Sequence, residues 1–114
     1  MSAKKDSELQ FKAVSKGKKT LRVGCEDYQL VFGTELKLNG VECHGVCDSG
    51  AKTIYLDVNS DQRQATLVHE LVHAAAAEFG LRHHEDWCPK LEELIAEMVA
   101  KVVVANYRLV ARKP

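Results

Sequence analysis

His69-Glu70-Leu71-Val72-His73 brings two imidazoles and a carboxylate into five consecutive residues, in the pattern H-E-x-x-H. On a helix, residues i and i+4 lie one above the other on the same face, so both imidazoles can reach one ion. Imidazole nitrogens bind Zn²⁺ well, and Glu70 lies beside the metal, where it can accept a proton from a metal-bound water. We therefore expect one Zn²⁺ per chain, bound by His69 and His73, with Glu70 as the general base.

The third ligand of such a site is expected downstream of the two histidines. Glu93 follows His73 by 20 residues, and Glu97 lies one helical turn further along the same face. A catalytic zinc ion commonly has three protein ligands and one open position for water. Glu93 would complete a set of two histidines and one glutamate, and Glu97 could orient one histidine through its free ring nitrogen. The other candidate third ligands are Glu92, His83 and His84.

The apolar residues around the motif have helical periodicity. They recur at i, i+3, i+4 and i+7 from Ala65 to Phe79, as in an amphipathic helix. Ser60-Asp61 is a candidate N-cap, because Gln64 stands three residues after Asp61 as in a capping box, and Gly80 is a typical stop signal. The sequence therefore predicts one helix that carries the whole H-E-x-x-H motif.

A second long helix is predicted to begin between Glu85 and Pro89, with Pro89 tolerated in its first turn, and to run to about Tyr107. Its β-branched last turns are equally compatible with a strand, so its end stays open. This helix carries the small residues Ala96 and Ala100, and the first helix carries Ala74–Ala77. Small side chains on both helices would let the two backbones approach closely.

The first half of the chain is strand-like. Alternating and β-branched residues predict strands at Leu21–Val23, Tyr28–Phe32, Leu36–Leu38 and Thr53–Val58. Gly33 is expected to end the second of these strands, and Asn39-Gly40 is a strong two-residue turn signal. The predicted fold class is therefore α+β, with a small three- to four-stranded sheet followed by the two helices.

Composition bounds the remaining possibilities. The chain has 114 residues with 46% apolar and 28% charged residues, which is the balance of one globular domain. We expect a flexible charged tail over residues 1–10 and a single domain over residues 11–114. The net charge is zero, which argues against a uniformly basic nucleic-acid binder. No apolar run reaches the ~20 residues that span a membrane, and the first residues do not form a signal peptide, so we expect a cytoplasmic protein.

Without a secretory signal, the four cysteines are expected to be free thiols. Cys43 and Cys47 are separated like some metal ligands, but a second pair of ligands is missing, and we interpret both as loop cysteines. The segment Cys47–Gly50 is expected to be the loop before the last strand.

The chain resembles the small phage and bacterial zincins of the minigluzincin type. The stretches that carry the resemblance are Gly45–Asp48, Thr53–Asp57, Thr66–Ala74 and Phe79–Leu81. The resemblance implies a zincin-like metallopeptidase in which His69 and His73 bind zinc and Glu70 is the general base. In gluzincins the third ligand is a glutamate on the next helix, often with an acidic residue four positions later, and Glu93 with Glu97 fits that pattern.

The chain is also similar to SprT-like proteases, because His83 is followed by the aromatic Trp87, although His84 stands where that family has glycine. This similarity would make His83 the third ligand and would imply substrates that are proteins bound to DNA. A further alternative is a metal-binding regulatory or virion-associated module with little turnover. In all the peptidase interpretations the substrate is a peptide or protein, and strand Thr53–Val58, if it is the sheet edge, could align it.

Overall fold

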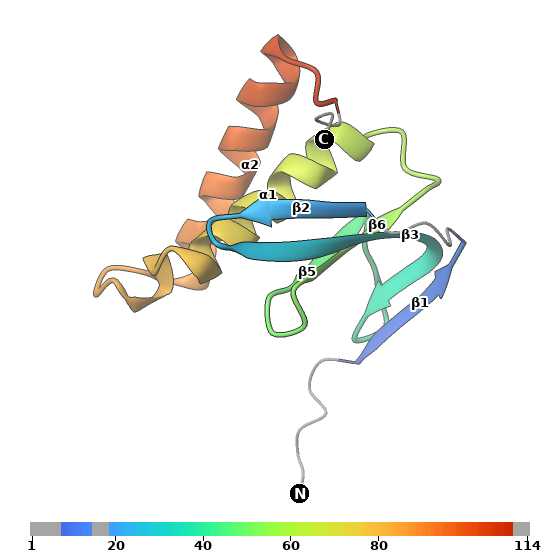
Figure 1. Cartoon of the computed structure of the whole chain (residues 1–114), viewed down its shortest axis with the longest axis horizontal. Helices are drawn as coiled ribbons and strands as arrows, with labels where there is room; N and C mark the ends of the chain where they lie inside the picture. Colours follow the sequence, from blue (N-terminus) through green and yellow to red (C-terminus); the bar gives the residue numbers. More distant parts are fainter. Residues whose placement is uncertain (1–7, 15–18, 111–114) are drawn as a thin grey trace, which may run out of the picture.

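The computed structural model describes residues 8–14 and 19–110 of the chain. Its strands are β1 (Leu9–Ala13), β2 (Lys19–Val23), β3 (Glu26–Leu38), β4 (Val41–Glu42), β5 (Gly45–Asp48) and β6 (Thr53–Asp57). Its helices are α1 (Arg63–Glu78), the short 3₁₀ turn η1 (Leu81–His83) and α2 (Pro89–Asn106). Helix α1 packs against the sheet and α2 packs against α1 (Figure 1). The fold class is therefore α+β, as the sequence predicts.

All six strands belong to one mixed sheet. Its order is β1-β3-β6-β5, and β2 and β4 also pair with β3. Strands β3 and β6 run parallel, whereas every other pair is antiparallel. The expected three to four strands were too few, because β1, β4 and β5 are too short or too polar to give a clear alternating pattern. Strand β1 begins at Leu9, inside the expected tail, and residues 1–7 of that tail lie outside the described residues.

The strand beside the helices at the sheet edge is β5, not β6. Thr53–Asp57 pairs with β3 on one side and with β5 on the other, so the expectation that this segment forms the edge was wrong. Cys47 and Asp48, interpreted from the sequence as the start of a loop, belong instead to the outer strand Gly45–Asp48. A four-residue strand carries too little alternation to be recognised without its partner.

Strand β3 continues through Gly33, where the sequence predicts an end. A Cβ atom at this position would lie 2.3 Å from Cζ of Phe11 and 2.4 Å from the carbonyl oxygen of Lys12, both in β1. Glycine is present here because β1 crosses closely, and it does not interrupt the strand. The turn predicted at Asn39-Gly40 is confirmed, since both residues have positive φ angles of 55° and 82°.

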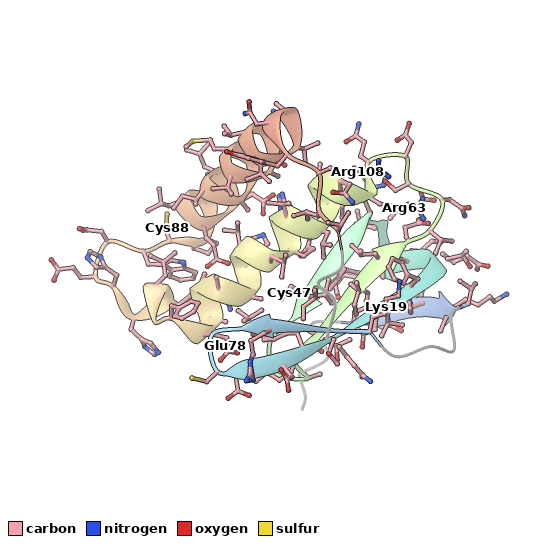
Figure 2. The ribbon with its side chains drawn as sticks, turned by 45° about the horizontal axis from the view of Figure 1, so that its top comes forward. Lys19, Cys47, Arg63, Glu78, Cys88 and Arg108 are labelled. Carbon is pink, nitrogen blue, oxygen red and sulfur yellow. The ribbon has the colours of Figure 1, made fainter. Side chains whose placement is uncertain are left out.

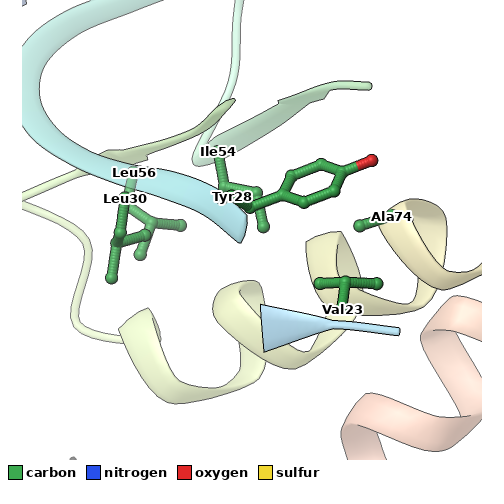
Figure 3. Close-up of a cluster of buried hydrophobic side chains, with 6 residues drawn as sticks. All are labelled: Val23, Tyr28, Leu30, Ile54, Leu56 and Ala74. Carbon is green, nitrogen blue, oxygen red and sulfur yellow. The ribbon is translucent and has the colours of Figure 1, made fainter. Parts of the chain in front are cut away.

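The core lies between the sheet and α1. Figure 3 shows the cluster, which comprises Val23, Tyr28, Leu30, Ile54, Leu56 and Ala74. The strand members alternate along β3 and β6 and therefore face the same side, which is the side that α1 covers. Burying each large side chain of this cluster contributes about 1.5–3 kcal/mol. This packing fixes the position of α1, and with it the position of the H-E-x-x-H motif.

A polar contact ties the end of α1 to the same core. Tyr28 is fully buried, and its hydroxyl donates a hydrogen bond of 2.7 Å to Glu78 in the last turn of α1. Lys52 forms an ion pair with the same carboxylate. Lys52 and Tyr28 together keep the pKa of Glu78 below its ordinary value, because they stabilise its ionised form. Glu78 lies beside the sheet at this end of the helix (Figure 2).

Helix α1 begins slightly later than expected. Gln62 is its N-cap residue without a side-chain cap, although the backbone N–H of Gln62 donates to Oγ of Ser60 at 3.1 Å. The capping box between Asp61 and Gln64 does not form. Gln64 instead exchanges two hydrogen bonds with the backbone of Leu109, at 3.1 and 2.7 Å, and so holds the segment after α2 against α1. Gly80, with a φ of 83°, follows the end of the helix as predicted.

Helix α2 is continuous from Pro89 to Asn106, including its β-branched last turns. Ala96 and Ala100 are buried, as the small-residue pattern predicts for close packing of the two helices. No helix in the described part of the chain is both long enough and apolar enough to cross a membrane. The expected free thiols are confirmed, since Cys25, Cys43, Cys47 and Cys88 are all unpaired. Figure 2 shows Cys88 at the start of α2 and Cys47 near α1.

Candidate metal centre

The two histidines of the motif converge on one carboxylate of α2. Nε2 of His69 lies 3.0 Å from Oε2 of Glu93, and Nε2 of His73 lies 3.1 Å from Oε1 of the same residue. The ring centroids of the two histidines are 5.0 Å apart. Of the four candidates for a third ligand, the structure brings Glu93 to the Nε2 atoms of both histidines.

The spacing of these atoms fits a small cation. One ligand atom from each of His69, His73 and Glu93 lies within 4.8 Å of the others, and no other such group occurs in residues 8–14 and 19–110. Ligands placed tetrahedrally at zinc–nitrogen and zinc–oxygen distances are ~3.4 Å apart. The two nitrogen–oxygen distances of 3.0 and 3.1 Å are a few tenths of an ångström shorter than this value, and each involves a different oxygen of Glu93.

Glu92, next to Glu93 on α2, holds the second nitrogen of His73. Its carboxylate is almost fully buried and lies 2.5 Å from Nδ1 of His73. Arg82 binds it through two bonds, from Nε at 2.9 Å and from Nη2 at 2.7 Å, and Nε1 of Trp87 adds a third at 2.9 Å. The Arg82 guanidinium is the main reason that the pKa of Glu92 is lowered to about 2, so this carboxylate is ionised and can only accept hydrogen bonds.

This network decides which nitrogen of His73 is free. Because Glu92 can only accept, Nδ1 of His73 must carry the proton. In the neutral ring, Nε2 then presents a lone pair to Oε1 of Glu93 at 3.1 Å, so two acceptors face each other. That arrangement is favourable only with a positive charge between the two atoms or on the ring. The same tautomer is the one that leaves Nε2 available to a metal ion.

Glu97 occupies the corresponding place beside His69, but more loosely. Its Oε2 lies 3.7 Å from Nδ1 of His69, which is within ion-pair distance and too long for a hydrogen bond. Glu92 therefore orients His73 through a short contact, whereas Glu97, which was expected to orient a histidine, makes only a long contact with His69.

The side chain of Glu70 lies against strand β5. A Cβ atom on Gly45 would lie 3.1 Å from Cγ of Glu70 and 2.6 Å from Cγ2 of Thr66, so only glycine allows β5 to approach this closely. Burial raises the pKa of Glu70 above its ordinary value, while the neighbouring His73 and His69 oppose the rise. Glu70 and His69 line the same surface hollow, so the carboxylate can meet a ligand there.

His83 and His84 do not join the site. Both are exposed in and after η1, and the Nδ1 atom of His84 accepts a hydrogen bond from the backbone of Asp86. Arg82 and Trp87 from the same loop reach the site instead, and sequence reasoning missed both. Adjacent helical residues point about 100° apart, so placing Glu93 on the histidines already implied another partner for Glu92.

Comparison of the chain with protein-family models, with curated proteins and with solved structures gives no match. The functional interpretation of this site therefore depends on its own geometry and chemistry.

Proposed function

We propose that the protein is a zincin-like zinc metallopeptidase. The observation that carries the proposal is the convergence of Nε2 of His69 and Nε2 of His73 on the carboxylate of Glu93, with Glu92 fixing the His73 tautomer. Three protein ligands of this type are the set that catalytic zinc uses in peptidases with two histidines and one glutamate. Such a set leaves a fourth position for water.

When bound, zinc would lower the pKa of a water molecule and polarise the carbonyl of the scissile peptide bond. Glu70 takes the proton of the attacking water and passes it to the leaving amine. Its burial suits this role, because a raised pKa brings the carboxylate closer to the pH at which it must both accept and release a proton. Glu92 keeps His73 in the tautomer that the site needs.

The outer edge of β5 is the surface that would align an extended peptide. In the described sheet, Gly45–Asp48 pairs only with β6, so no strand occupies the other edge of β5, where strand addition would take place. Gly45 also lines the hollow beside His69 and Glu70. Adding a peptide to the zinc-loaded Glu70→Gln protein should slow hydrogen exchange of amides in β5. Unchanged exchange there would exclude this mode of substrate binding.

Zinc content measured by elemental analysis tests the metal centre. The wild type should carry one zinc per chain, and His73→Ala and Glu93→Ala should each lose it. His83→Ala is the matched control, because it removes an exposed histidine from the neighbouring loop, and it should retain the metal. Loss of zinc in His83→Ala with retention in Glu93→Ala would contradict the proposed ligand set and favour an SprT-like site. A wild type that binds no added zinc would refute the proposal.

Glu70→Gln separates a peptidase from a metal-binding module. The variant should keep zinc and lose hydrolysis of an unstructured protein such as casein by at least ~100-fold, since the general base is removed. A wild type that binds zinc but hydrolyses no peptide, and behaves like Glu70→Gln in every assay, would leave only the binding function.

A further inference from the structure

A hollow of about 270 Å³ opens next to His69 and Glu70, between β5, the first half of α1 and the second half of α2. Its volume is below the ~300 Å³ at which pockets for whole ligands begin, so it is suited to one side chain of a larger substrate. Because it continues directly from the candidate metal centre, that side chain would belong to a residue next to the scissile bond.

Small residues create the space. Gly45 contributes no side chain from β5, and Ala65 and Ala100 contribute only methyl groups from the two helices. The polar residues that line the hollow beyond the catalytic motif are His44, Gln62, Thr66, Glu97 and Lys101. The hollow is therefore lined both by small residues and by polar ones, and its specificity depends on the charges among the polar residues.

The charges are distributed unequally along α2. Glu97 already faces Nδ1 of His69 at 3.7 Å, so its negative charge is directed at the metal centre. Lys101 follows one turn later, about 6 Å further along the helix axis. Within the described residues, no carboxylate lies at ion-pair distance from Lys101. Lys101 is the only lysine or arginine among the residues that line the hollow.

We propose that Lys101 makes this hollow a binding site for an acidic side chain, so that the preferred substrate has Asp or Glu next to the scissile bond. The inference depends on the proposed peptidase function, which it makes more specific. Repulsion by Glu97 at the metal end confines the carboxylate of the substrate to the Lys101 end. Lys101 is exposed, and an ion pair at the upper end of the range for exposed pairs corresponds to a preference of about fivefold over the neutral amide.

Hydroxamates test the preference without turnover, because the hydroxamate group anchors the ligand at zinc and leaves its side chain to enter the hollow. The probes are the hydroxamates of N-acetyl-glutamate, N-acetyl-glutamine and N-acetyl-lysine, titrated into the zinc-loaded protein by calorimetry. The wild type should bind the glutamate probe about fivefold more tightly than the glutamine probe. Lys101→Glu should reverse the order in favour of the lysine probe.

Lys90→Glu is the matched control, since it makes the same charge change on the same helix, 11 residues or about 16 Å from Lys101 and outside the hollow. It should leave the order of the three probes unchanged. Equal binding of the probes by the wild type, or an unchanged order in Lys101→Glu, would overturn the inference, as would failure of all three to bind.

Hydrolysis of peptides with Glu, Gln or Lys beside the cleaved bond distinguishes failure of the proposed acidic preference from failure of the proposed peptidase function. Cleavage of all three peptides at the same kcat/KM would support the peptidase function and contradict the role of Lys101. If no peptide is cleaved but the order of hydroxamate affinities still changes with the charge of residue 101, the peptidase function is contradicted and a binding site for acidic groups at the metal centre remains.

Discussion

Replacing Glu92 by glutamine should separate the group that orients the metal centre from the group that binds the metal. The two oxygens of Glu92 together accept four hydrogen bonds, from His73, Trp87 and twice from Arg82. A glutamine has one oxygen, and its NH₂ group can only donate. Whichever way the amide is oriented, two of the four hydrogen bonds are lost, and the other two are made to a neutral oxygen instead of a carboxylate.

The magnitude follows from the burial of Glu92, of which only 3% is exposed. Two hydrogen bonds to a charged group contribute together about 3 kcal/mol at the lower end of their range. At about 4 °C per kcal/mol for a domain of this size, the metal-free variant should unfold about 12 °C below the wild type. Zinc affinity should fall about 10- to 100-fold, because His73 is no longer held in one tautomer.

Glu93→Gln is the matched comparison one residue later. The side chain of Glu93 is 54% exposed, so the metal-free protein should unfold within about 2 °C of the wild type. Its zinc affinity should fall further than that of Glu92→Gln, because a ligand is removed. The assays are thermal unfolding of the metal-free proteins and zinc competition with a chelator. Equal stability of the wild type and Glu92→Gln, or a comparable loss in Glu93→Gln, would refute the assignment of the two roles.

The pH dependence of the same stability difference has a defined sign. The pKa of Glu92 falls from its ordinary value of 4.5 to about 2 in the folded protein, chiefly through Arg82. Ionised Glu92 therefore stabilises the fold above pH 4.5, and this contribution is lost as the pH falls towards 2. The difference between the wild type and Glu92→Gln should be constant near neutrality and should shrink below pH 4.5. A difference that persists at pH 2 would contradict the charge-based explanation.

Two further predictions concern strand β5. Gly45→Ala should destabilise the protein by about 1–3 kcal/mol and reduce hydrolysis, because the new methyl group would lie 2.6 Å from Cγ2 of Thr66. Thr66→Ser removes that Cγ2 atom. The double variant with Gly45→Ala and Thr66→Ser should therefore recover part of the unfolding temperature that Gly45→Ala loses. Burial, with a smaller contribution from Glu70, raises the pKa of the Cys47 thiol to about 12. At pH 8, iodoacetamide should therefore modify Cys47 at least ~100-fold more slowly than the exposed Cys25, as measured by mass spectrometry of peptides. Equal rates would show that β5 opens readily.

The sequence alone was informative wherever chemistry depends on spacing within one element. The helix that carries His69 and His73 was predictable because its apolar period repeats over four turns. The turn at Asn39-Gly40 was also predictable, since few residue pairs adopt two positive φ angles without strain. Glu93 could be identified as a candidate third ligand because it follows the motif on the next helix, but the sequence alone did not exclude Glu92, His83 or His84 from that role.

The short strands were not predictable for a physical reason. Gly45–Asp48 has four residues, and its strand conformation depends on hydrogen bonds to β6 rather than on its own preferences. Gly33 was misread because a glycine required by the close approach of another strand has the same letter as a glycine that ends a strand. The capping box at Asp61 failed because Gln64 makes its hydrogen bonds with Leu109, 45 residues away.

The sequence by itself determined that two imidazoles and a carboxylate share one helix, since that geometry follows from 3.6 residues per turn. Only the tertiary structure decided that Glu93 meets both Nε2 atoms while Glu92 takes Nδ1 of His73. That outcome depends on the rotation of α2 against α1, which is set by the buried faces of Ala96 and Ala100 and by the clamp of Arg82 on Glu92. These are long-range contacts, and no local pattern in the chain encodes their register.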